Sequence, residues 1–261
     1  MIKFEKPITE TDDTKKFVFC TSSYNQCQFI NKNLESIKMQ NYSKDKYRIV
    51  YINDASTDDS KKYLEDFMKN NQDINMKLIN NEKNMGPAYS RYVCSHECED
   101  DEICVFLDGD DWLIEKNTLG ILSYVYKNND IYATFGSMQG HKYQYNSWII
   151  FIRNNKKINY FPHLRTAYAF ICKNVPEKYL KYKNKEWFIF NTDVAFFTCI
   201  AELCGNKYAF IKNEFVYYNQ YNCSTNEKTG WHHHANNFQA LKRKQYRWWI
   251  KRKLKPLDKI V

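Results

Sequence analysis

Short apolar segments alternate with helical segments along the first half of the chain, and this alternation constrains the fold more than any other feature. The apolar segments, each ending near polar residues, are 17–20, 47–52, 76–79, 103–107 and 131–135. Between them, apolar residues recur near a 3.6-residue period, as over residues 29–39, and a further helix is expected near 116–128. Strands that alternate with helices predict an α/β fold with a mostly parallel, Rossmann-like sheet and helices on both faces.

Polar side chains follow the predicted strands at the point where each strand ends. Tyr24, Asp54, Asn84 and the acidic loop 108–111 each come directly after one of them. In an open parallel sheet, ligands bind beyond the carboxyl ends of the strands. We therefore expect these residues to converge on one crevice.

The acidic loop carries the chemistry that is easiest to interpret. Asp108 and Asp110 flank a glycine, so both carboxylates can turn toward one point beyond the strand end. Carboxylate oxygens are hard ligands that suit Mg²⁺ or Mn²⁺ and leave other positions for phosphate oxygens and water. The alternative is a solvated acidic turn, but the apolar strand before the loop and Trp112 after it favour a metal site.

Four segments together resemble the family 2 glycosyltransferases, which have the GT-A fold. They are 21–25 (TSSYN), 53–58 (NDASTD), 84–91 (NMGPAYSR) and 107–111 (LDGDD), and their order and spacing match over residues 17–135. Weaker similarity, at 162–166, 193–195, 201–203 and 217–219, is to members that decorate bacterial or viral surface glycans. The series is specific as a whole, whereas each motif alone is weak.

The resemblance implies a donor site for a nucleotide sugar. Thr21 and Tyr24 would line the nucleotide pocket, Asp54 would hydrogen-bond the base, often the imide of uracil, and Asn84 and Arg91 would lie near the base or diphosphate. Bland alternatives remain open: Tyr24 as packing, Asp54 as an acceptor for loop N–H groups, and Arg91 as a surface helix residue.

The resemblance also implies roles within the acidic loop. Asp110 would be the leading ligand for Mn²⁺ or Mg²⁺, Asp108 would contact the ribose or the metal, and Asp111 would orient the metal's water or the donor sugar. Some GT-A enzymes complete the metal shell with a C-terminal histidine. His234 is the weak candidate here, within the run 232–234, and a flexible polar loop is the alternative.

Family 2 enzymes invert the anomeric centre, so a base must deprotonate the acceptor hydroxyl. Asp193 is at the matching position, although a helix N-cap is an alternative role, and this chain has Thr192 where the family often has glutamate. His163 and Arg165 would lie near the acceptor or the leaving phosphate, or would stabilise a loop.

Four segments are expected along the chain. They are a polar leader (1–16), a nucleotide-sugar-binding half (17–136), an acceptor-side half of the same GT-A domain (137–240) and a basic C-terminal helix (241–261). The helix carries much of the net charge of +9, and residues 241–255 would either dock on the domain or make peripheral contact with an anionic membrane. Nucleic-acid binding is not expected, because no RNP, KH, zinc-finger or helix-turn-helix signature is present.

The cysteines and the hydropathy pattern indicate a cytoplasmic protein, with the membrane surface as an alternative location. The nine cysteines follow no disulfide-scaffold spacing, and Cys94-x-x-x-Cys98 lacks a second pair at finger spacing, so neither disulfides nor zinc are expected. The beginning of the chain is polar, and no apolar stretch reaches the roughly 18–20 residues of a membrane span.

The sequence thus predicts an inverting, metal-assisted glycosyltransferase. The donor would be a nucleotide-diphosphate sugar, with a UDP-sugar favoured, and the acceptor a hydroxyl of a glycan, lipid or protein. One rival is a sugar nucleotidyltransferase, which the lack of a Gly-rich, basic triphosphate loop after the first strand disfavours. Another rival is a catalytically silent glycan- or membrane-binding protein.

Overall fold

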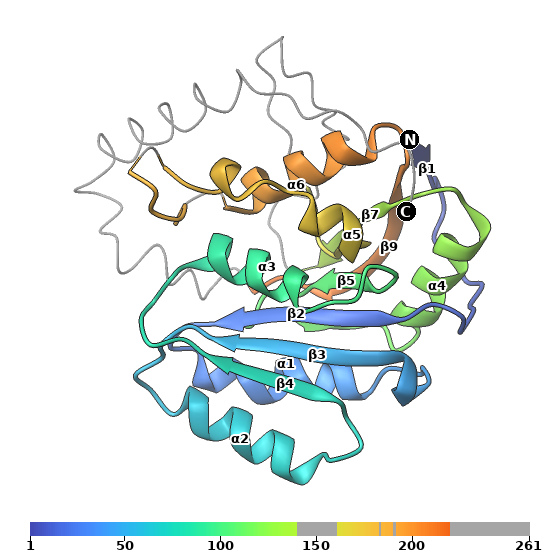
Figure 1. The fold of residues 1–261 in the computed structure, drawn as a ribbon. Helices are drawn as coiled ribbons and strands as arrows, with labels where there is room; N and C mark the ends of the chain where they lie inside the picture. Colours follow the sequence, from blue (N-terminus) through green and yellow to red (C-terminus); the bar gives the residue numbers. More distant parts are fainter. Residues whose placement is uncertain (140–160, 183, 190–191, 220–261) are drawn as a thin grey trace.

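A computed structural model describes residues 1–139, 161–182, 184–189 and 192–219. Within these ranges the chain forms a sheet of nine strands between two layers of helices (Figure 1). The apolar segment 148–152, whose sequence favours a strand, lies outside the described residues, as do the histidines 232–234 and the basic segment 241–261.

The sheet contains the predicted parallel core. Strands β2, β3, β4 and β5 run parallel, β8 runs against its neighbours β5 and β7, and β6 pairs antiparallel with β9. The order is β1-β9-β7-β8-β5-β2-β3-β4, with β6 off this path. The strands are β1 (Ile2–Lys3), β2 (Phe17–Ser23), β3 (Tyr47–Asn53), β4 (Met76–Asn80), β5 (Ile103–Phe106), β6 (Trp112–Leu113), β7 (Ala133–Gln139), β8 (Arg165–Tyr168) and β9 (Tyr208–Tyr217).

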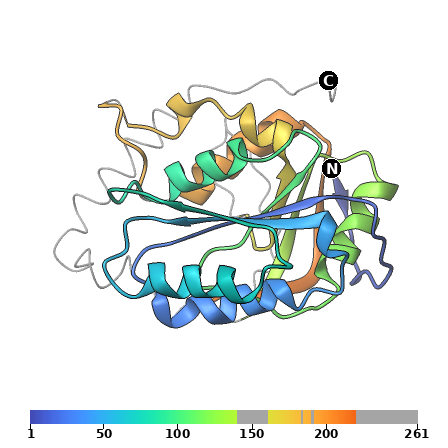
Figure 2. The same ribbon diagram turned by 60° about the horizontal axis from the view of Figure 1, so that its bottom comes forward.

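The helices cover both faces of the sheet. Helices α1 and α2 lie on one face, and α3, α5 and α6 lie on the other, as the two views agree (Figures 1 and 2). The helices are α1 (Cys27–Lys38), α2 (Ser60–Asn70), α3 (Pro87–His96), α4 (Thr118–Asn128), α5 (Ala169–Lys173) and α6 (Thr192–Cys204), with short 3₁₀ turns at Lys44–Lys46 and Glu177–Tyr179. The predicted α/β class, with a mainly parallel central sheet, is confirmed.

Local sequence explains where the elements begin and end. The central strand β5 is apolar at every position because helices bury both of its faces. Gly86 has a φ of +82°, which a residue with a Cβ rarely adopts, and Pro87 then occupies the first turn of α3, where no N–H is needed. The two apolar segments 210–211 and 215–217 belong to one continuous strand, β9, which ends at Tyr217.

The polar N-terminal segment is part of the domain. Strand β1 pairs with β9, and Ile8 is buried in the core. The Asp12 carboxylate accepts hydrogen bonds from the Ser123 hydroxyl and the Lys127 ammonium of α4. Residues 1–16, predicted as a polar leader, therefore add a strand to the sheet and form hydrogen bonds with α4.

Several cysteines meet in the core. The Sγ atoms of Cys20, Cys98 and Cys104 lie within 4.8 Å of one another, which chain spacing alone did not reveal, and burial raises the pKa of the Cys20 thiol. Cys94 is also buried, whereas His96 is exposed and bonds the backbone of its own helix. Among the helices within the described ranges, none has both the length and the apolar character that a membrane span requires.

Candidate active site

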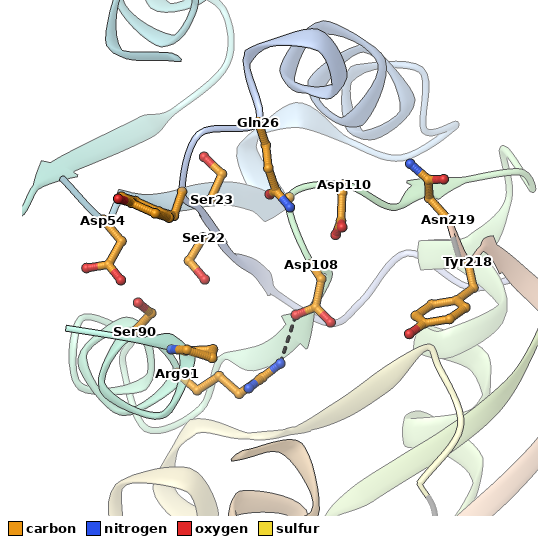
Figure 3. A pocket seen from close by; sticks show the side chains of 13 residues that line it. Ser22, Ser23, Gln26, Asp54, Ser90, Arg91, Asp108, Asp110, Tyr218 and Asn219 are labelled. Atoms are coloured by element: carbon orange, nitrogen blue, oxygen red, sulfur yellow. Dashed lines mark hydrogen bonds and ion pairs between the residues drawn. The ribbon is translucent and has the colours of Figure 1, made fainter. Parts of the chain in front are cut away.

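A pocket lies where the carboxyl ends of β2, β3 and β5 meet, at the end of the sheet predicted to bind a ligand (Figure 3). Its volume is about 220 Å³. The walls are formed by Ser22, Ser23, Tyr24, Gln26, Asp54, Pro87, Ser90, Arg91, Asp108, Gly109, Asp110, Tyr218 and Asn219. The end of β2, the start of α3, the acidic loop and the residues after β9 therefore face one cavity.

The acidic loop is held against β2 and α1. The Gly109 N–H donates to the Ser22 carbonyl over 3.1 Å, and a Cβ at position 109 would lie 2.7 Å from that same oxygen. The Asn33 side-chain amide donates to the carbonyls of Asp108 and Asp111, over 3.1 and 2.8 Å. The glycine between the carboxylates is thus required for this close approach.

Asp108 is paired with an arginine inside the pocket. The Arg91 guanidinium donates to Asp108 Oδ1 over 2.9 Å, as the dashed line in Figure 3 marks. Burial raises the pKa of Asp108, but the positive charges of Arg91 and Arg165 outweigh it and bring the pKa down to about 2. Asp108 is therefore ionised at neutral pH and available to a cation or a ribose hydroxyl.

Asp111 differs sharply from Asp108, although only three positions separate them. Its side chain is 1% exposed, and its Oδ1 accepts the Asn219 N–H over 2.9 Å. Within the described ranges its Oδ2 has no hydrogen-bond partner, and it lies 3.6 Å from His163 Nδ1. Burial, with the like charges of Asp110 and Asp108, raises the pKa of Asp111 well above its usual range.

His163 completes a group that fits a divalent cation. Burial and the nearby Arg165 lower the pKa of His163 to about 3, so the imidazole is neutral, the form that binds metals. Its Nδ1 is buried and, like Asp111 Oδ2, has no hydrogen-bond partner in the part of the chain that the structure describes. Ligand atoms of Asp108, Asp111 and His163 all lie within 4.8 Å of one another. Two unsatisfied buried atoms and a carboxylate are a suitable donor set for Mn²⁺ or Mg²⁺.

Asp54 lines the pocket and also accepts hydrogen bonds from the loop that precedes α3. Its carboxylate accepts the Asn81 side-chain amide over 2.7 Å, the Met85 N–H over 2.9 Å and the Gly86 N–H over 2.8 Å. A carboxylate has about four acceptor positions, so one position remains for a ligand. Binding the base and holding the loop are therefore compatible roles.

Asp193 lies in the first turn of α6 and is held by a buried arginine. Arg165 Nη2 donates to Asp193 Oδ2 over 3.1 Å, and the Asp193 side chain is 26% exposed. Arg165 Nε donates to the Phe161 carbonyl over 2.7 Å, and the guanidinium lies 5.0 Å from the centre of the Phe197 ring. The carboxylate is thus partly open to solvent and fixed on one side.

The sequence profile of the family described as Glycosyl transferase family 2 matches residues 19–189, which is more than half of the chain. The chain belongs to glycosyl transferase family 2. Within the family, a teichoic acid poly(glycerol phosphate) polymerase of Staphylococcus epidermidis is 33% identical over 115 residues, 44% of this chain and 15% of the relative. The poly(ribitol-phosphate) beta-N-acetylglucosaminyltransferase TarS of Staphylococcus aureus Mu50 is 32% identical over 105 residues, 40% of this chain and 18% of the relative.

Solved structures show that the fold is the GT-A fold of glycosyltransferases. Staphylococcus aureus TarS 1–349 in complex with UDP aligns with a TM-score of 0.61 and 20% identity over 78% of this chain and 60% of that one. The mannosyltransferase PcManGT of Pyrobaculum calidifontis, in complex with GDP-Man and Mn²⁺, aligns with a TM-score of 0.56 and 18% identity over 80% and 59%. The chain spans less than a fifth of the length of the two curated relatives.

Five residues predicted for the donor or metal site of this family 2 chain line one cavity. They are Tyr24, Asp54, Arg91, Asp108 and Asp110. Arg91 is only 8% exposed, so the alternative interpretation of Arg91 as a surface helix residue is wrong.

The other predicted residues lie outside the pocket wall. Thr21 is buried, and none of the described residues forms a hydrogen bond with its hydroxyl, whereas Asn84 is exposed. Asp111, His163, Arg165 and Asp193 are not among the lining residues, although contacts of at most 3.9 Å connect them to each other or to Asp108. His234 lies outside the described residues.

Sequence reasoning missed several polar residues of the site. Asn33 is buried on the apolar face of α1 with Ile30 and Leu34. A polar residue at that spacing indicates a buried side chain that needs hydrogen-bond partners, and the sequence pattern could have identified it. Gln26 and Ser90 also line the pocket and carried no comparable signal. Asn219 belongs to the segment 217–219 that resembles the family, but no role had been assigned to it.

Proposed function

We propose that the protein is an inverting glycosyltransferase that moves a sugar from a nucleotide-diphosphate donor, with a UDP-sugar favoured, to an acceptor hydroxyl. The observation that carries this proposal is the cavity of a GT-A fold that Asp54, Arg91, Asp108 and Asp110 share. Proteins of the same fold have been solved with UDP, with UDP-GlcNAc, and with GDP-Man and Mn²⁺, which supports a nucleotide-sugar donor.

The donor would occupy the pocket between the end of β2 and the start of α3. Tyr24 supplies an aromatic ring and Asp54 an acceptor for a base N–H, while Arg91 supplies positive charge for the diphosphate. Thr21 and Asn84 lie off the pocket wall, so we place them in supporting the loops at this end of the sheet.

Mn²⁺ or Mg²⁺ would be held by the acidic loop, and His163 extends the donor set that the sequence predicted. Asp108 and Asp110 both line the cavity (Figure 3), and ligand atoms of Asp108, Asp111 and His163 lie within 4.8 Å of one another. A bound ion would neutralise charge on the leaving nucleoside diphosphate. His234, as a weak candidate for a further ligand, stays a prediction.

Asp193 would act as the general base. As the acceptor oxygen bonds to the anomeric carbon, the bond from that carbon to the diphosphate oxygen breaks, and Asp193 takes the hydroxyl proton. Attack from the face opposite the leaving group inverts the anomeric centre. Arg165 holds one oxygen of Asp193, which leaves the other oxygen for the acceptor.

The acceptor would be a hydroxyl of a glycan polymer, with lipid and protein hydroxyls as alternatives. The curated relatives bear the names of enzymes that act on poly(glycerol phosphate) or poly(ribitol phosphate), and a net charge of +9 favours an anionic acceptor. We further propose a cytoplasmic location, with peripheral contact through residues 241–255 at an anionic membrane as the alternative, and no nucleic-acid partner.

The experiment is a donor and acceptor screen. The protein is incubated with Mn²⁺, a panel of nucleotide sugars and polyol-phosphate or neutral glycan acceptors, and products are identified by mass spectrometry and their anomers by NMR. We expect the wild type to transfer the sugar with inversion. We expect Asp193→Asn to lose transfer and to keep its affinity for the donor. A folded protein that binds donor without transfer or hydrolysis would instead be a silent binding protein, and formation of a nucleotide sugar from a nucleoside triphosphate would indicate a nucleotidyltransferase.

A further inference from the structure

We propose that Thr192 is a positioning residue that, through Arg91, sets the distance between the base helix α6 and the acidic loop. The inference rests on the proposed function, because it assigns Thr192 a part in the transfer step. Thr192 directly precedes Asp193 in the first turn of α6.

Arg91 forms a bridge between two elements that are far apart in sequence. Its Nη1 donates to Thr192 Oγ1 over 2.7 Å, and its Nη2 donates to Asp108 Oδ1 over 2.9 Å. Arg91 is 8% exposed and Thr192 is 5% exposed, so little water competes for either bond. One planar guanidinium thus joins the first turn of α6 to the carboxylate that begins the acidic loop.

The geometry of the guanidinium gives this bridge its effect. Because the N–H groups of arginine point in fixed directions, two acceptors bound to one guanidinium are held at a defined separation. One acceptor is next to Asp193, the proposed base, and the other is two positions from Asp110, the proposed metal ligand. The two bonds therefore help to hold the first turn of α6 at a fixed distance from the acidic loop.

A second arginine limits how α6 can move but does not replace the bridge. Arg165 holds the Asp193 carboxylate and is itself anchored to the Phe161 carbonyl. Arg165 thus fixes the direction in which the base points. The Thr192–Arg91 bond links the start of α6 to α3 and, through Arg91, to Asp108.

The test replaces Thr192 with valine, which has the same shape and lacks the hydroxyl, and with serine, which keeps it. Thr198→Val is the matched control, because Thr198 lies in the same helix and its hydroxyl bonds only the Val194 carbonyl of that helix among the contacts described, over 2.7 Å. In the full-length protein, three quantities are measured for each variant: kcat for transfer, donor KM, and the slow hydrolysis of donor without acceptor.

We expect Thr192→Val to lower kcat for transfer about tenfold to a hundredfold, since small misplacements of reacting groups have effects of that size. Donor KM and donor hydrolysis should change less than about twofold, because neither needs the base to be aligned with an acceptor. Thr192→Ser should restore transfer, and Thr198→Val should behave like the wild type.

The outcomes separate this inference from the proposed function. If the wild type turns over no donor, the proposed function fails and the inference fails with it. If the wild type is active and Thr192→Val lowers transfer and hydrolysis equally, or lowers neither, the positioning role is overturned while the function stands. Thermal unfolding tests the bridge without measuring activity. Thr192→Val should lower Tm much less in an Arg91→Lys background than in the wild type. An equal shift of Tm in both backgrounds would overturn the bridge.

Discussion

Asp54→Asn separates the two roles that the Asp54 carboxylate can play, because the substitution keeps the shape of the side chain and removes one acceptor oxygen. In the structure, the carboxylate accepts three hydrogen bonds from the loop 81–86 and is 4% exposed. An asparagine at this position would keep one acceptor oxygen, for the Asn81 amide and the Met85 N–H. Its NH₂ group would then face the Gly86 N–H, so that two donors would meet and neither would have an acceptor.

The expected loss of stability follows from those contacts. The Gly86 N–H is buried, so leaving it without an acceptor costs about 1–3 kcal/mol. The remaining bonds lose the charge assistance that makes them roughly twice as strong as neutral bonds. We therefore expect the free energy of unfolding to fall by about 3 kcal/mol, a large part of the roughly 5–15 kcal/mol that holds a domain together.

Urea unfolding followed by circular dichroism measures this loss, and UDP affinity is measured on the same protein. Asp59→Asn is the matched control, since Asp59 is exposed, makes no capping bond to α2 and should change stability by less than about 0.5 kcal/mol. UDP affinity should also fall in Asp54→Asn, because the loop leads into Pro87 and Ser90 of the pocket wall. Unchanged stability with lost UDP affinity would refute the loop-holding role.

Three other substitutions test different parts of the structure. Gly109→Ala should abolish donor binding, because the new Cβ would lie 2.7 Å from the Ser22 carbonyl and push the acidic loop off β2; unchanged UDP affinity would contradict this. His163→Ala should weaken Mn²⁺ binding about tenfold or more in titrations, whereas unaltered metal affinity would exclude His163 as a ligand. Burial raises the pKa of Asp12, but the hydrogen bonds from Lys127, Thr14 and Ser123 outweigh it and lower the pKa. Asp12→Asn should therefore destabilise the fold by about 2 kcal/mol at neutral pH. This contribution should be complete above the unfolded-state pKa and vanish as the pH falls through the lower folded-state pKa, and an equal effect of Asp12→Asn at about pH 2 and pH 7 would contradict it.

The alternation of strands and helices was enough to predict at which end of the sheet the pocket lies. The carboxyl ends of parallel strands meet at one end of a sheet, so Tyr24, Asp54 and Asp108 could be brought together from the sequence alone. The same rule did not extend to Asn84, which follows β4 at the edge of the sheet and remains exposed.

The surroundings of Arg165 and Asp193 depend on contacts that no local pattern encodes. Strand β8 inserts antiparallel between β5 and β7, and this places Arg165 in the core opposite Phe106 and Phe135. The Arg165 guanidinium can be buried there because it donates hydrogen bonds to Asp193 and to the Phe161 carbonyl. Asp193 comes from a distant segment of the chain. The bond between Arg91 and Thr192 spans about a hundred residues and is likewise visible only in three dimensions.

Binding of UDP in the presence and absence of metal tests the central claim most directly. Isothermal titration calorimetry with Mn²⁺ should give one UDP site per chain, with affinity that falls about tenfold or more in EDTA and in Asp110→Asn. A folded wild-type protein that binds no nucleoside diphosphate, or binds UDP equally well in EDTA and in Asp110→Asn, would contradict a metal-assisted nucleotide-sugar site at the acidic loop.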